Sequence, residues 1–331
     1  MAKLFLTFLS FFIAAGAVAL TISVLWLASS YNRAGPLKQE TIVEIEKGSS
    51  LNAIAHDLKT KNIIHSETAF IVLTRILDRH KSLQAGEYRF GPGQTIREVK
   101  EKLASGAVYQ RSLTIKEGLT SIEIMELLNQ AAAMEGRIET PPAQGTVLPE
   151  TYFYEKGVKR KDMLRRMKSL MDATLDTLWK ERSRPSVLKS KEEAVILASI
   201  IEKEAGNRQE MDKIAGVFVN RLKKGMRLQS DPTVIFAITK GEPERAGYGP
   251  LGRRLNRKDW DYESPYNTYR NAGLPPGPIC HPGRESLRAA LNPANHDYYY
   301  FVANGDGGHA FARTLDDHNR NVMKWREIRD N

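Results

Sequence analysis

The stretch AVILASIIEKEAG, residues 194–206, runs through eight residues in which only Ser199 interrupts the apolar side chains, and then places two carboxyl groups, Glu202 and Glu204, at its end. A carboxyl group beside a dry surface is costly to ionise, so its pKa rises and it can hold a proton near neutral pH. A general acid requires this property. The stretch therefore predicts a helix that ends in a candidate acid catalyst.

The two glutamates fall on opposite flanks of this predicted helix. At about 100° per residue, one narrow stripe collects apolar side chains that we expect to form a packing surface: Ala194, Ala198, Ile201 and Ala205. Glu202 and Glu204 lie roughly 80° to either side of the stripe. Periodicity does not choose between them, and either is also compatible with an ordinary charge in the last turn of a helix.

The N-terminal segment Leu4–Ala28 contains no charged residue. At about 1.5 Å per residue, a helix of this length covers the roughly 30 Å hydrocarbon layer of a bilayer. We predict one membrane-spanning helix; the alternative, a cleaved signal peptide, usually has an apolar region of only about 7 to 15 residues. Because the start is short and basic, we expect everything after residue 30 to lie outside the cytoplasmic membrane.

Charge and cysteine content narrow the class of protein further. The net charge of +10 over 331 residues favours an anionic partner. The predicted anchor disfavours nucleic acid, and the basic residues are scattered, as on a solvated helix face. Cys280 is the only cysteine, which excludes an intramolecular disulfide.

A strand–glycine–cap–helix pattern recurs after residue 40. The copies are VEIEKGSSLNAIAHDL from Val43, YRFGPGQTIREVKEKL from Tyr88 and a looser LTIKEGLTSIEIMELL from Leu113. Each combines an alternating strand, a glycine turn, a Ser or Thr cap and an amphipathic helix. Another helix follows Ser66, within residues 66–80. Such units resemble the LysM-like modules that recognise the sugar backbone of peptidoglycan, although a simple spacer explains the pattern equally well.

The later part of the chain is predicted to be mainly helical. Apolar periodicity indicates helices at about 160–181, 190–205 and 210–224 and a short one from Pro232, with Ser230 or Asp231 as its start. A long loop rich in Gly, Pro, Asn and Tyr spans residues 248–283, and a loop of this length is usually functional. A hairpin, residues 298–303 and 309–312, is predicted to turn on NGDGG.

Several chemistries are disfavoured by the residues present. The seven histidines show no i, i+4 pair of a helical zinc site, so we expect no catalytic metal. Cys280 and His281 are chain neighbours, which is no indication of a thiol dyad, and no GxSxG elbow is present. Glycan cleavage by carboxyl groups remains.

Such cleavage can use one or two carboxyl groups. An ordinary glycosidase pairs its acid with a second carboxylate, for which Asp231, Asp259, Asp261 and Glu263 are candidates. A single acid suffices when the sugar supplies its own nucleophile, as when the C6 hydroxyl of N-acetylmuramic acid attacks C1 and leaves a 1,6-anhydro end.

Four ordered motifs carry a resemblance to a known family: LASIIEKEAG, VFVNRLKKGMRLQSDPTVIFAI, SPYNTYRNAGLPPGPICHPGRESLRAALNPA and YYYFVANGDGGHAF. Together with the anchor, they resemble the endolytic murein transglycosylase family of bacterial inner-membrane proteins over about residues 40–325. The resemblance implies a LysM-like region followed by a lytic transglycosylase domain that faces the periplasm and acts on newly made peptidoglycan. It implies no cofactor, and it implies cell-wall synthases, the penicillin-binding proteins, as partners.

The resemblance also implies roles for individual residues. The first glutamate of the EKE motif, Glu202, would be the acid that protonates the glycosidic oxygen and then the base toward the C6 hydroxyl, whereas Glu204 would be structural. QSDPT and YNTY would lie at the cleft, because hydroxyls and amides bind sugar substituents and aromatic faces stack on sugar rings. The predicted substrate-binding residues are Gln229, Ser230, Asp231, Tyr266, Asn267 and Tyr269.

We therefore expect an α+β fold with a single N-terminal transmembrane helix, a small LysM-like region and a mainly helical, lysozyme-like catalytic domain with long loops and a β-hairpin. The expected boundaries are 1–30 for the cytoplasmic start and anchor, 31–40 for a linker, 41–110 for the LysM-like region and 111–331 for the catalytic domain. The expected function is strand-shortening lytic cleavage with anhydro ends. A non-enzymatic peptidoglycan-binding scaffold and a two-carboxylate muramidase, which leaves a reducing end, are the alternatives.

Overall fold

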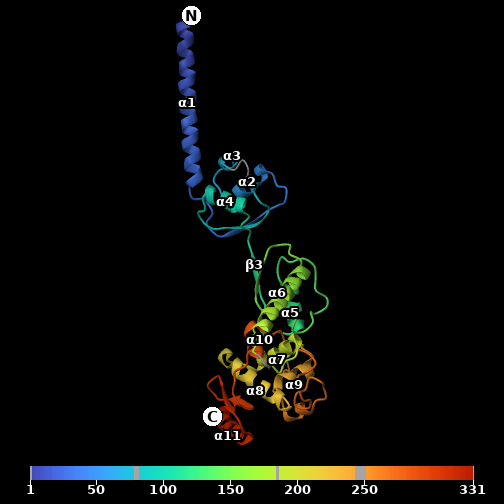
Figure 1. Ribbon diagram of the computed structural model, residues 1–331. Helices are drawn as coiled ribbons and strands as arrows, with labels where there is room; N and C mark the ends of the chain where they lie inside the picture. Colours follow the sequence, from blue (N-terminus) through green and yellow to red (C-terminus); the bar gives the residue numbers. More distant parts are fainter. Residues whose placement is uncertain (1, 78–81, 184–185, 243–250, 331) are drawn as a thin grey trace. The chain divides into compact units, whose positions relative to one another are not determined.

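The computed structural model describes residues 2–77, 82–183, 186–242 and 251–330 (Figure 1). The fold is mixed α+β, mostly helical, and the described residues form three small two-stranded sheets. The chain divides into two compact units. The first unit comprises residues 1–111 and 154–156, and the second comprises residues 112–153 and 157–331.

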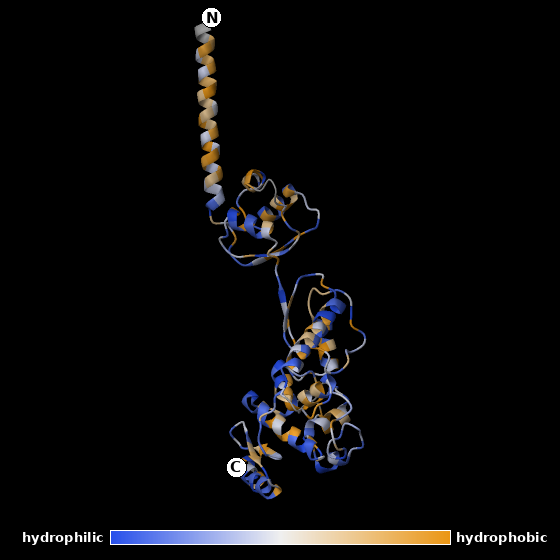
Figure 2. Cartoon of the chain, viewed as in Figure 1, coloured by the Kyte–Doolittle hydropathy of each residue, from blue (hydrophilic) through white to orange (hydrophobic). Residues whose placement is uncertain are grey.

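The first unit begins with a long apolar helix, α1 (Ala2–Asn32). Its segment Phe5–Asn32 is long and apolar enough to cross a membrane (Figure 2). Most of the large apolar side chains of this segment are exposed. The predicted apolar helix is therefore confirmed. Length and composition suit either a membrane anchor or a signal sequence.

The first two copies of the repeated pattern pair with each other in the first unit. Strands β1 (Thr41–Ile45) and β2 (Gly86–Phe90) are antiparallel, and Val43 lies directly opposite Tyr88. Gly48 and Gly93 adopt left-handed backbone angles, with φ of 87° and 71°, as the predicted glycine turns require. The predicted repeat is thus two halves of one small sheet.

Helices cover this sheet and enclose the core of the first unit. Each copy leads into a helix, α2 (Leu51–Thr60) capped by Ser50 and α4 (Ile96–Ser105) capped by Thr95, and α3 (Glu67–Leu77) lies between them in sequence. Buried apolar side chains from all of these elements form one cluster, including Val43, Leu58, Phe70, Tyr88 and Leu103. The predicted end of α3, residues 78–80, lies outside the described residues.

The third, looser copy belongs mainly to the second unit. Its strand β3 (Arg111–Thr114) pairs with β4 (Thr151–Tyr154), and its helix α5 (Ser121–Gln130) starts with a capping box between Thr120 and Glu123. The sequence pattern thus predicted its local structure correctly, although the copy pairs with a later segment rather than with the first two copies.

The second unit contains the predicted helices and two more. The predicted helices are α6 (Arg160–Lys180), α7 (Lys191–Glu204), α8 (Met211–Lys223) and α9 (Asp231–Thr239). The additional helices are α10 (Arg284–Leu291) and α11 (Leu315–Asp330), and two 3-10 turns are η1 (Arg208–Glu210) and η2 (Arg257–Asp261). The predicted hairpin is formed by β5 (Tyr300–Ala303) and β6 (His309–Ala312), with Phe301 opposite Phe311.

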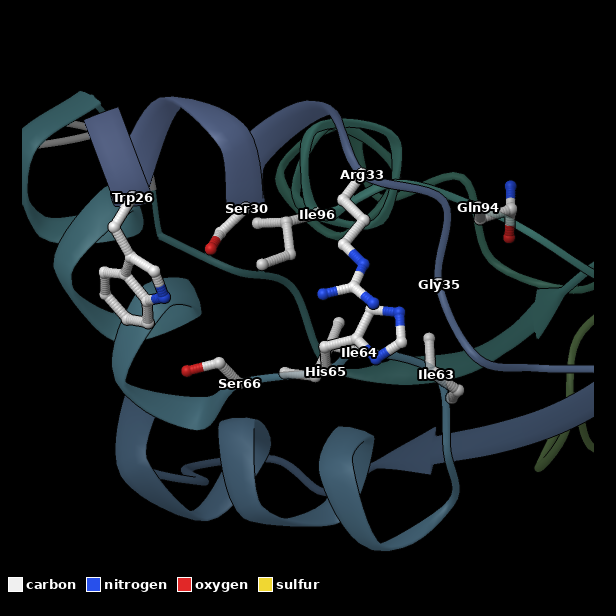
Figure 3. A pocket seen from close by; sticks show the side chains of 10 residues that line it. All are labelled: Trp26, Ser30, Arg33, Gly35, Ile63, Ile64, His65, Ser66, Gln94 and Ile96. Atoms are coloured by element: carbon white, nitrogen blue, oxygen red, sulfur yellow. The ribbon is translucent and has the colours of Figure 1, made fainter. Parts of the chain in front are cut away.

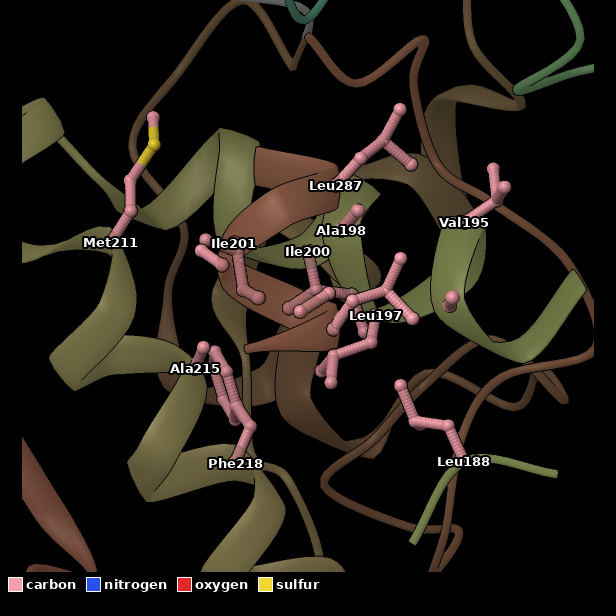
Figure 4. Packing of buried hydrophobic residues seen from close by; sticks show 14 of the residues in the cluster. Leu188, Val195, Leu197, Ala198, Ile200, Ile201, Met211, Ala215, Phe218 and Leu287 are labelled. Carbon is pink, nitrogen blue, oxygen red and sulfur yellow. The ribbon is translucent and has the colours of Figure 1, made fainter. Parts of the chain in front are cut away.

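Helix α7 is the centre of the second unit. Every residue from Ala194 to Ile201 is buried, because α8, α9 and α10 pack around it (Figure 4). The predicted packing surface was therefore too narrow, since other faces of the helix are covered as well. The one polar residue in the run, Ser199, donates to the carbonyl of Ile196 and accepts from the backbone N–H of Ile279, at 2.7 and 3.0 Å.

Candidate functional site

The two glutamates at the end of α7 line two different clefts of the second unit. Glu204 lies in a cleft, here called the Glu204 cleft, formed by the ends of α7 and α8, the start of α9, the β5–β6 hairpin and α11. Glu202 lies in a second cleft, the Glu202 cleft, formed by the segment 114–117, the segment 148–151, η1 and the start of α10. Their predicted placement on opposite flanks of the helix is confirmed.

The carboxyl group of Glu204 has the environment that the apolar run was expected to create. Ser230 Oγ donates to Glu204 Oε1 at 2.6 Å. Burial raises the pKa of Glu204 to about 7, and the charge of Asp231 acts in the same direction, whereas the Ser230 hydroxyl and Arg221 partly oppose this. A carboxyl group with this pKa holds a proton near neutral pH and can deliver it to a bound ligand.

The hydroxyl of Ser230 is available to Glu204 because it does not cap helix α9. Ser230 occupies the N-cap position of α9, as predicted, but its side chain makes no cap hydrogen bond. Its backbone N–H donates to Thr268 Oγ1 at 3.0 Å. The preceding Gln229 has a left-handed φ of 50°, and its N–H donates to the carbonyl of Thr268 at 3.2 Å. The long loop thus holds the start of α9 against the end of α7.

Asp231 and Tyr269 line one side of the Glu204 cleft, and Trp260 contacts both of them. Tyr269 Oη and Trp260 Nε1 both donate to Asp231 Oδ1, at 2.7 and 3.2 Å. The two rings are stacked, with centroids 5.0 Å apart and an interplanar angle of 10°. Burial and the Asp231 carboxylate raise the pKa of Tyr269, so its hydroxyl stays a donor. Trp260 leaves 36% of its surface exposed, and such a face can stack on a sugar ring.

The predicted substrate-binding residues divide into two groups. Gln229, Asp231 and Tyr269 line the Glu204 cleft, and Ser230 contacts Glu204 itself. Asn267 is fully buried, and its side-chain amide donates to the carbonyls of Trp260 and Tyr262 at 2.9 and 2.8 Å, so it organises the loop.

Tyr266 packs against Phe236 at a centroid distance of 5.0 Å, outside the lining of the cleft. The start of the predicted long loop, residues 248–250, lies outside the described residues. The structure thus gathers four of the six predicted residues around Glu204, and it places Glu202 in the other cleft.

Glu202 is bound by the start of α10. Its Oε2 accepts hydrogen bonds from the backbone N–H of Gly283 at 2.9 Å and from Ser286 Oγ at 2.5 Å. Both donors belong to the N-terminus of a helix, where the partial positive charge of the helix dipole favours a carboxylate. A Cβ on Gly283 would lie 2.2 Å from Glu117 Oε1, so a larger residue at this position would require the Glu117 side chain to move.

Glu117 is a cleft residue that the sequence did not single out. It forms an ion pair with Arg208 at the rim of the Glu202 cleft. Burial, followed by the charge of Glu202, raises the pKa of Glu117. No local signal identifies it, because its ion-pair partner, Arg208, lies 91 residues further along the chain. The Glu202 cleft therefore holds two carboxyl groups, each with its own stabilising partners.

Other candidate chemistries find no support in the described ranges. There, no three His, Cys, Asp or Glu side chains are grouped to hold a metal ion. Cys280 is buried, and burial raises the pKa of its thiol. The ring of the adjacent His281 hydrogen-bonds instead with Ser121 Oγ and the backbone N–H of Val147, both at 3.0 Å. Cys280 and His281 are therefore both parts of the buried core.

A further pocket lies in the first unit, at the end of α1 (Figure 3). Trp26, Arg33, His65 and Gln94 are among the residues that line it, and none of its lining residues carries a carboxyl group. The ring of His65 is bound to the carbonyl of Ala34 through Nε2 at 3.0 Å. This pocket therefore offers no acid of the kind found at the end of α7.

Comparison with known proteins gives a consistent result. The model of the YceG-like family matches residues 43–324. A protein of Bacillus subtilis named endolytic murein transglycosylase is 34% identical over 315 residues, which cover 86% of this chain and 84% of the relative. A protein of the same name from Streptococcus pneumoniae serotype 2 is 25% identical, and the match covers 87% of this chain and 58% of that protein.

A solved structure also matches. The 2.6 Å crystal structure of a YceG-like protein from Listeria monocytogenes is 30% identical, with a TM-score of 0.52, over 86% of this chain and 99% of the solved chain. The family match covers both the strand–helix repeats and the helices that build the two clefts. This chain belongs to the YceG-like family.

Proposed function

We propose that this chain is an endolytic lytic transglycosylase of peptidoglycan. It would cleave the β-1,4 bond between N-acetylmuramic acid and N-acetylglucosamine in nascent strands, leave 1,6-anhydro ends and so limit strand length. The observation that carries the proposal is Glu204, an acid whose pKa is raised to about 7 inside a cleft lined by amide, hydroxyl and aromatic groups. The relatives named endolytic murein transglycosylases support the substrate class.

In this proposal, one carboxyl group performs both proton transfers. The protonated Glu204 gives its proton to the glycosidic oxygen as the bond from C1 of the muramic acid to that oxygen breaks. The C6 hydroxyl oxygen of the same ring then bonds to C1, and its proton passes to the Glu204 carboxylate, which restores the acid. No water is consumed, so the products are one anhydro end and one new free 4-hydroxyl.

The geometry favours Glu204 over Glu202 as this acid. Glu202 Oε2 already accepts two hydrogen bonds at a helix N-terminus, which suits a side chain that holds α10 in place. Glu204 receives one hydroxyl donor and shares its cleft with Gln229, Asp231 and Tyr269. Because the EKE motif by resemblance assigns the role to Glu202, the two residues are competing candidates and are tested together.

The substrate contacts follow from the same cleft. Gln229 and Asp231 would bind hydroxyl or acetamido groups of the glycan. The stacked Tyr269 and Trp260 rings would hold a sugar ring, because aromatic faces pair well with the apolar faces of sugars. Ser230 would support Glu204, and Tyr266 and Asn267 would support the loop that carries Tyr269.

The remaining architecture is proposed as follows. The α1 helix anchors the protein once in the bacterial inner membrane, with a linker at 31–40 and a glycan-binding, LysM-like region at 41–110. A lysozyme-like catalytic domain at 111–331 then lies in the periplasm, where cell-wall synthases act on the same strands. The apolar α1 helix and the repeated strand–helix units are the observations that support this arrangement.

A two-carboxylate muramidase is the second candidate function, and one observation favours it. Asp231 lines the same cleft as Glu204, so a second carboxylate is at hand to activate water. Its Oδ1 is already bound by Tyr269 and Trp260, which favours a role in binding instead. The product separates the two functions, since hydrolysis leaves a reducing end.

The test is mass spectrometry of the products that the full chain, in detergent, makes from uncrosslinked glycan strands. Glu204→Gln and Glu202→Gln are the matched variants, since each removes one carboxyl group and keeps its shape. We expect anhydro ends from the wild type and from Glu202→Gln, and none from Glu204→Gln. Reducing ends would establish the muramidase, and uncut strands that still bind would establish the non-enzymatic scaffold.

A further inference from the structure

The Glu204 cleft contains an imidazole that is held by a carboxylate. His309, the first residue of β6, lines the cleft, and its Nδ1 lies 2.8 Å from Oε2 of Glu210. The backbone N–H of His309 donates to the other oxygen of the same carboxylate at 3.2 Å. Only 14% of the His309 side chain and 18% of the Glu210 side chain are exposed. The carboxylate of Glu210 therefore binds both the backbone N–H and the ring of His309.

Aromatic contacts restrict the same ring further. Phe301 meets it edge to face, with centroids 5.3 Å apart at 88°, and Phe311 lies 6.4 Å away at 60°. A carboxylate bound to one ring nitrogen sets the tautomer, because the proton stays on the nitrogen that faces it. Nδ1 then carries the proton toward Glu210. Across the described residues, no hydrogen-bond partner is found for Nε2.

The hydrogen bonds of His309 differ from those of a histidine that only belongs to the core. A buried imidazole normally uses both nitrogens, as His281 does with Ser121 and Val147. His309 uses one nitrogen and turns its ring into the cleft that contains Glu204. The hairpin that carries it packs on the helical core through Phe301 and Phe311, and Glu210, directly before α8, adds a contact to its second strand.

We propose that His309 is a substrate-contacting residue of the Glu204 cleft and that Glu210 is a positioning residue that acts through it. Nε2 accepts a hydrogen bond from a hydroxyl or acetamido N–H of the glycan and so orients the sugar whose bond is cut. This inference rests on the proposed function, since it names a further contact for the same substrate. Neither residue belongs to the substrate-binding set expected from the sequence.

The experiment measures kcat and KM of the full chain in detergent on uncrosslinked glycan strands. His309→Asn is the decisive variant, because an Asn side chain can still donate to Glu210 in place of Nδ1 but has no atom in place of Nε2. We expect kcat/KM to fall by roughly 10- to 100-fold, the range typical of lost substrate positioning. A purely structural role predicts that His309→Asn stays near the wild type, and that result would overturn the proposal.

Glu210→Gln tests the positioning role. We expect a loss of kcat/KM no larger than that of His309→Asn, and the double variant should be no worse than His309→Asn alone, because Glu210 acts only through the ring. Additive losses would contradict this. Arg165→Gln is the control: Arg165 also pairs with a carboxylate, Asp162, at 2.9 Å, but on the exposed surface of α6 and outside the lining of both clefts, so its loss should leave activity unchanged.

Binding separates this inference from the proposed function. In a Glu204→Gln background, adding His309→Asn should weaken the affinity for intact strands by a similar factor, whatever reaction the wild type performs. If the variants do not fold, the long-range ¹⁵N spectrum of wild-type protein labelled on histidine decides. Adding strands should then shift the Nε2 signal of one histidine whose Nδ1 carries the proton, and an unchanged spectrum overturns the proposal.

Discussion

The Glu202 cleft and the Glu204 cleft lie at the end of the same helix, yet they surround their glutamates with different hydrogen-bond partners. Glu202 receives a backbone N–H and a hydroxyl from the start of α10, which stabilise a carboxylate. Glu204 receives one hydroxyl and has Asp231 nearby, and its pKa rises to about 7. The partners and burial of each carboxyl group therefore assign the acid. Position along the helix does not.

The largest effect is expected in the rates of the two glutamine variants. Glu204→Gln should lower kcat by roughly 10²- to 10⁴-fold, the usual contribution of a general acid. Glu202→Gln keeps the shape that holds α10 and should cost less than about 10-fold. Initial rates of anhydro-end formation from uncrosslinked strands measure both. The reverse ranking would make Glu202 the acid, as the motif resemblance implies.

The next effect concerns the two serines that bind these glutamates. Ser286→Ala removes a donor from the Glu202 carboxylate and should lower the free energy of unfolding by about 1–3 kcal/mol, as for hydrogen bonds to charged groups. Ser230→Ala should cost less, because Glu204 can keep its proton when the donor is lost. Thermal unfolding of the full chain compares the two. Equal losses would mean that both glutamates are held as carboxylates.

The pH dependence of stability should also differ between the clefts. The pKa of Glu204 is about 7 in the folded chain against an ordinary 4.5. Below pH 4.5 the group is protonated in both states, and as pH rises toward 7 the unfolded state loses its proton first and is favoured. This group therefore removes stability between pH 4.5 and 7, by about 3 kcal/mol in full.

Glu204→Gln abolishes that penalty. Its midpoint of thermal unfolding should exceed the wild-type value at pH 8 and match it at pH 4. Glu202→Gln weakens two hydrogen bonds to a carboxylate, so its midpoint at pH 8 should lie below the wild type. Scans of the three proteins at both pH values are the measurement, and a destabilised Glu204→Gln at pH 8 would contradict the assignment.

Local patterns in the sequence predicted much of the fold. The apolar helix α1, the strand–glycine–cap–helix copies, the helices from α6 to α9 and the hairpin all follow from periodicity and cap residues. These signals are local, because a turn or a cap is satisfied within a few residues. The helix α10 was missed, although RESLRAAL after Gly283 is a short amphipathic pattern.

The candidate site was predicted only in part. The motif residues Gln229, Ser230, Asp231 and Tyr269 were expected at one cleft and do lie together. Their partner in the structure is Glu204, because the hydroxyl of Ser230 turns away from its capping position. No pattern along the chain signals such a diversion.

By itself, the sequence determined that an apolar helix would end in two carboxyl groups on opposite flanks and that the chain belongs with glycan-cleaving proteins of one family. Only the tertiary structure decided which carboxyl group lies with the polar and aromatic residues. It also brought Glu117 into the Glu202 cleft, and His309, bound by Glu210, into the Glu204 cleft. The physical reason is that the pKa of a carboxyl group depends on burial and on donors that arrive from distant segments. Those contacts exist only after α7, α9, α10 and the hairpin have packed together.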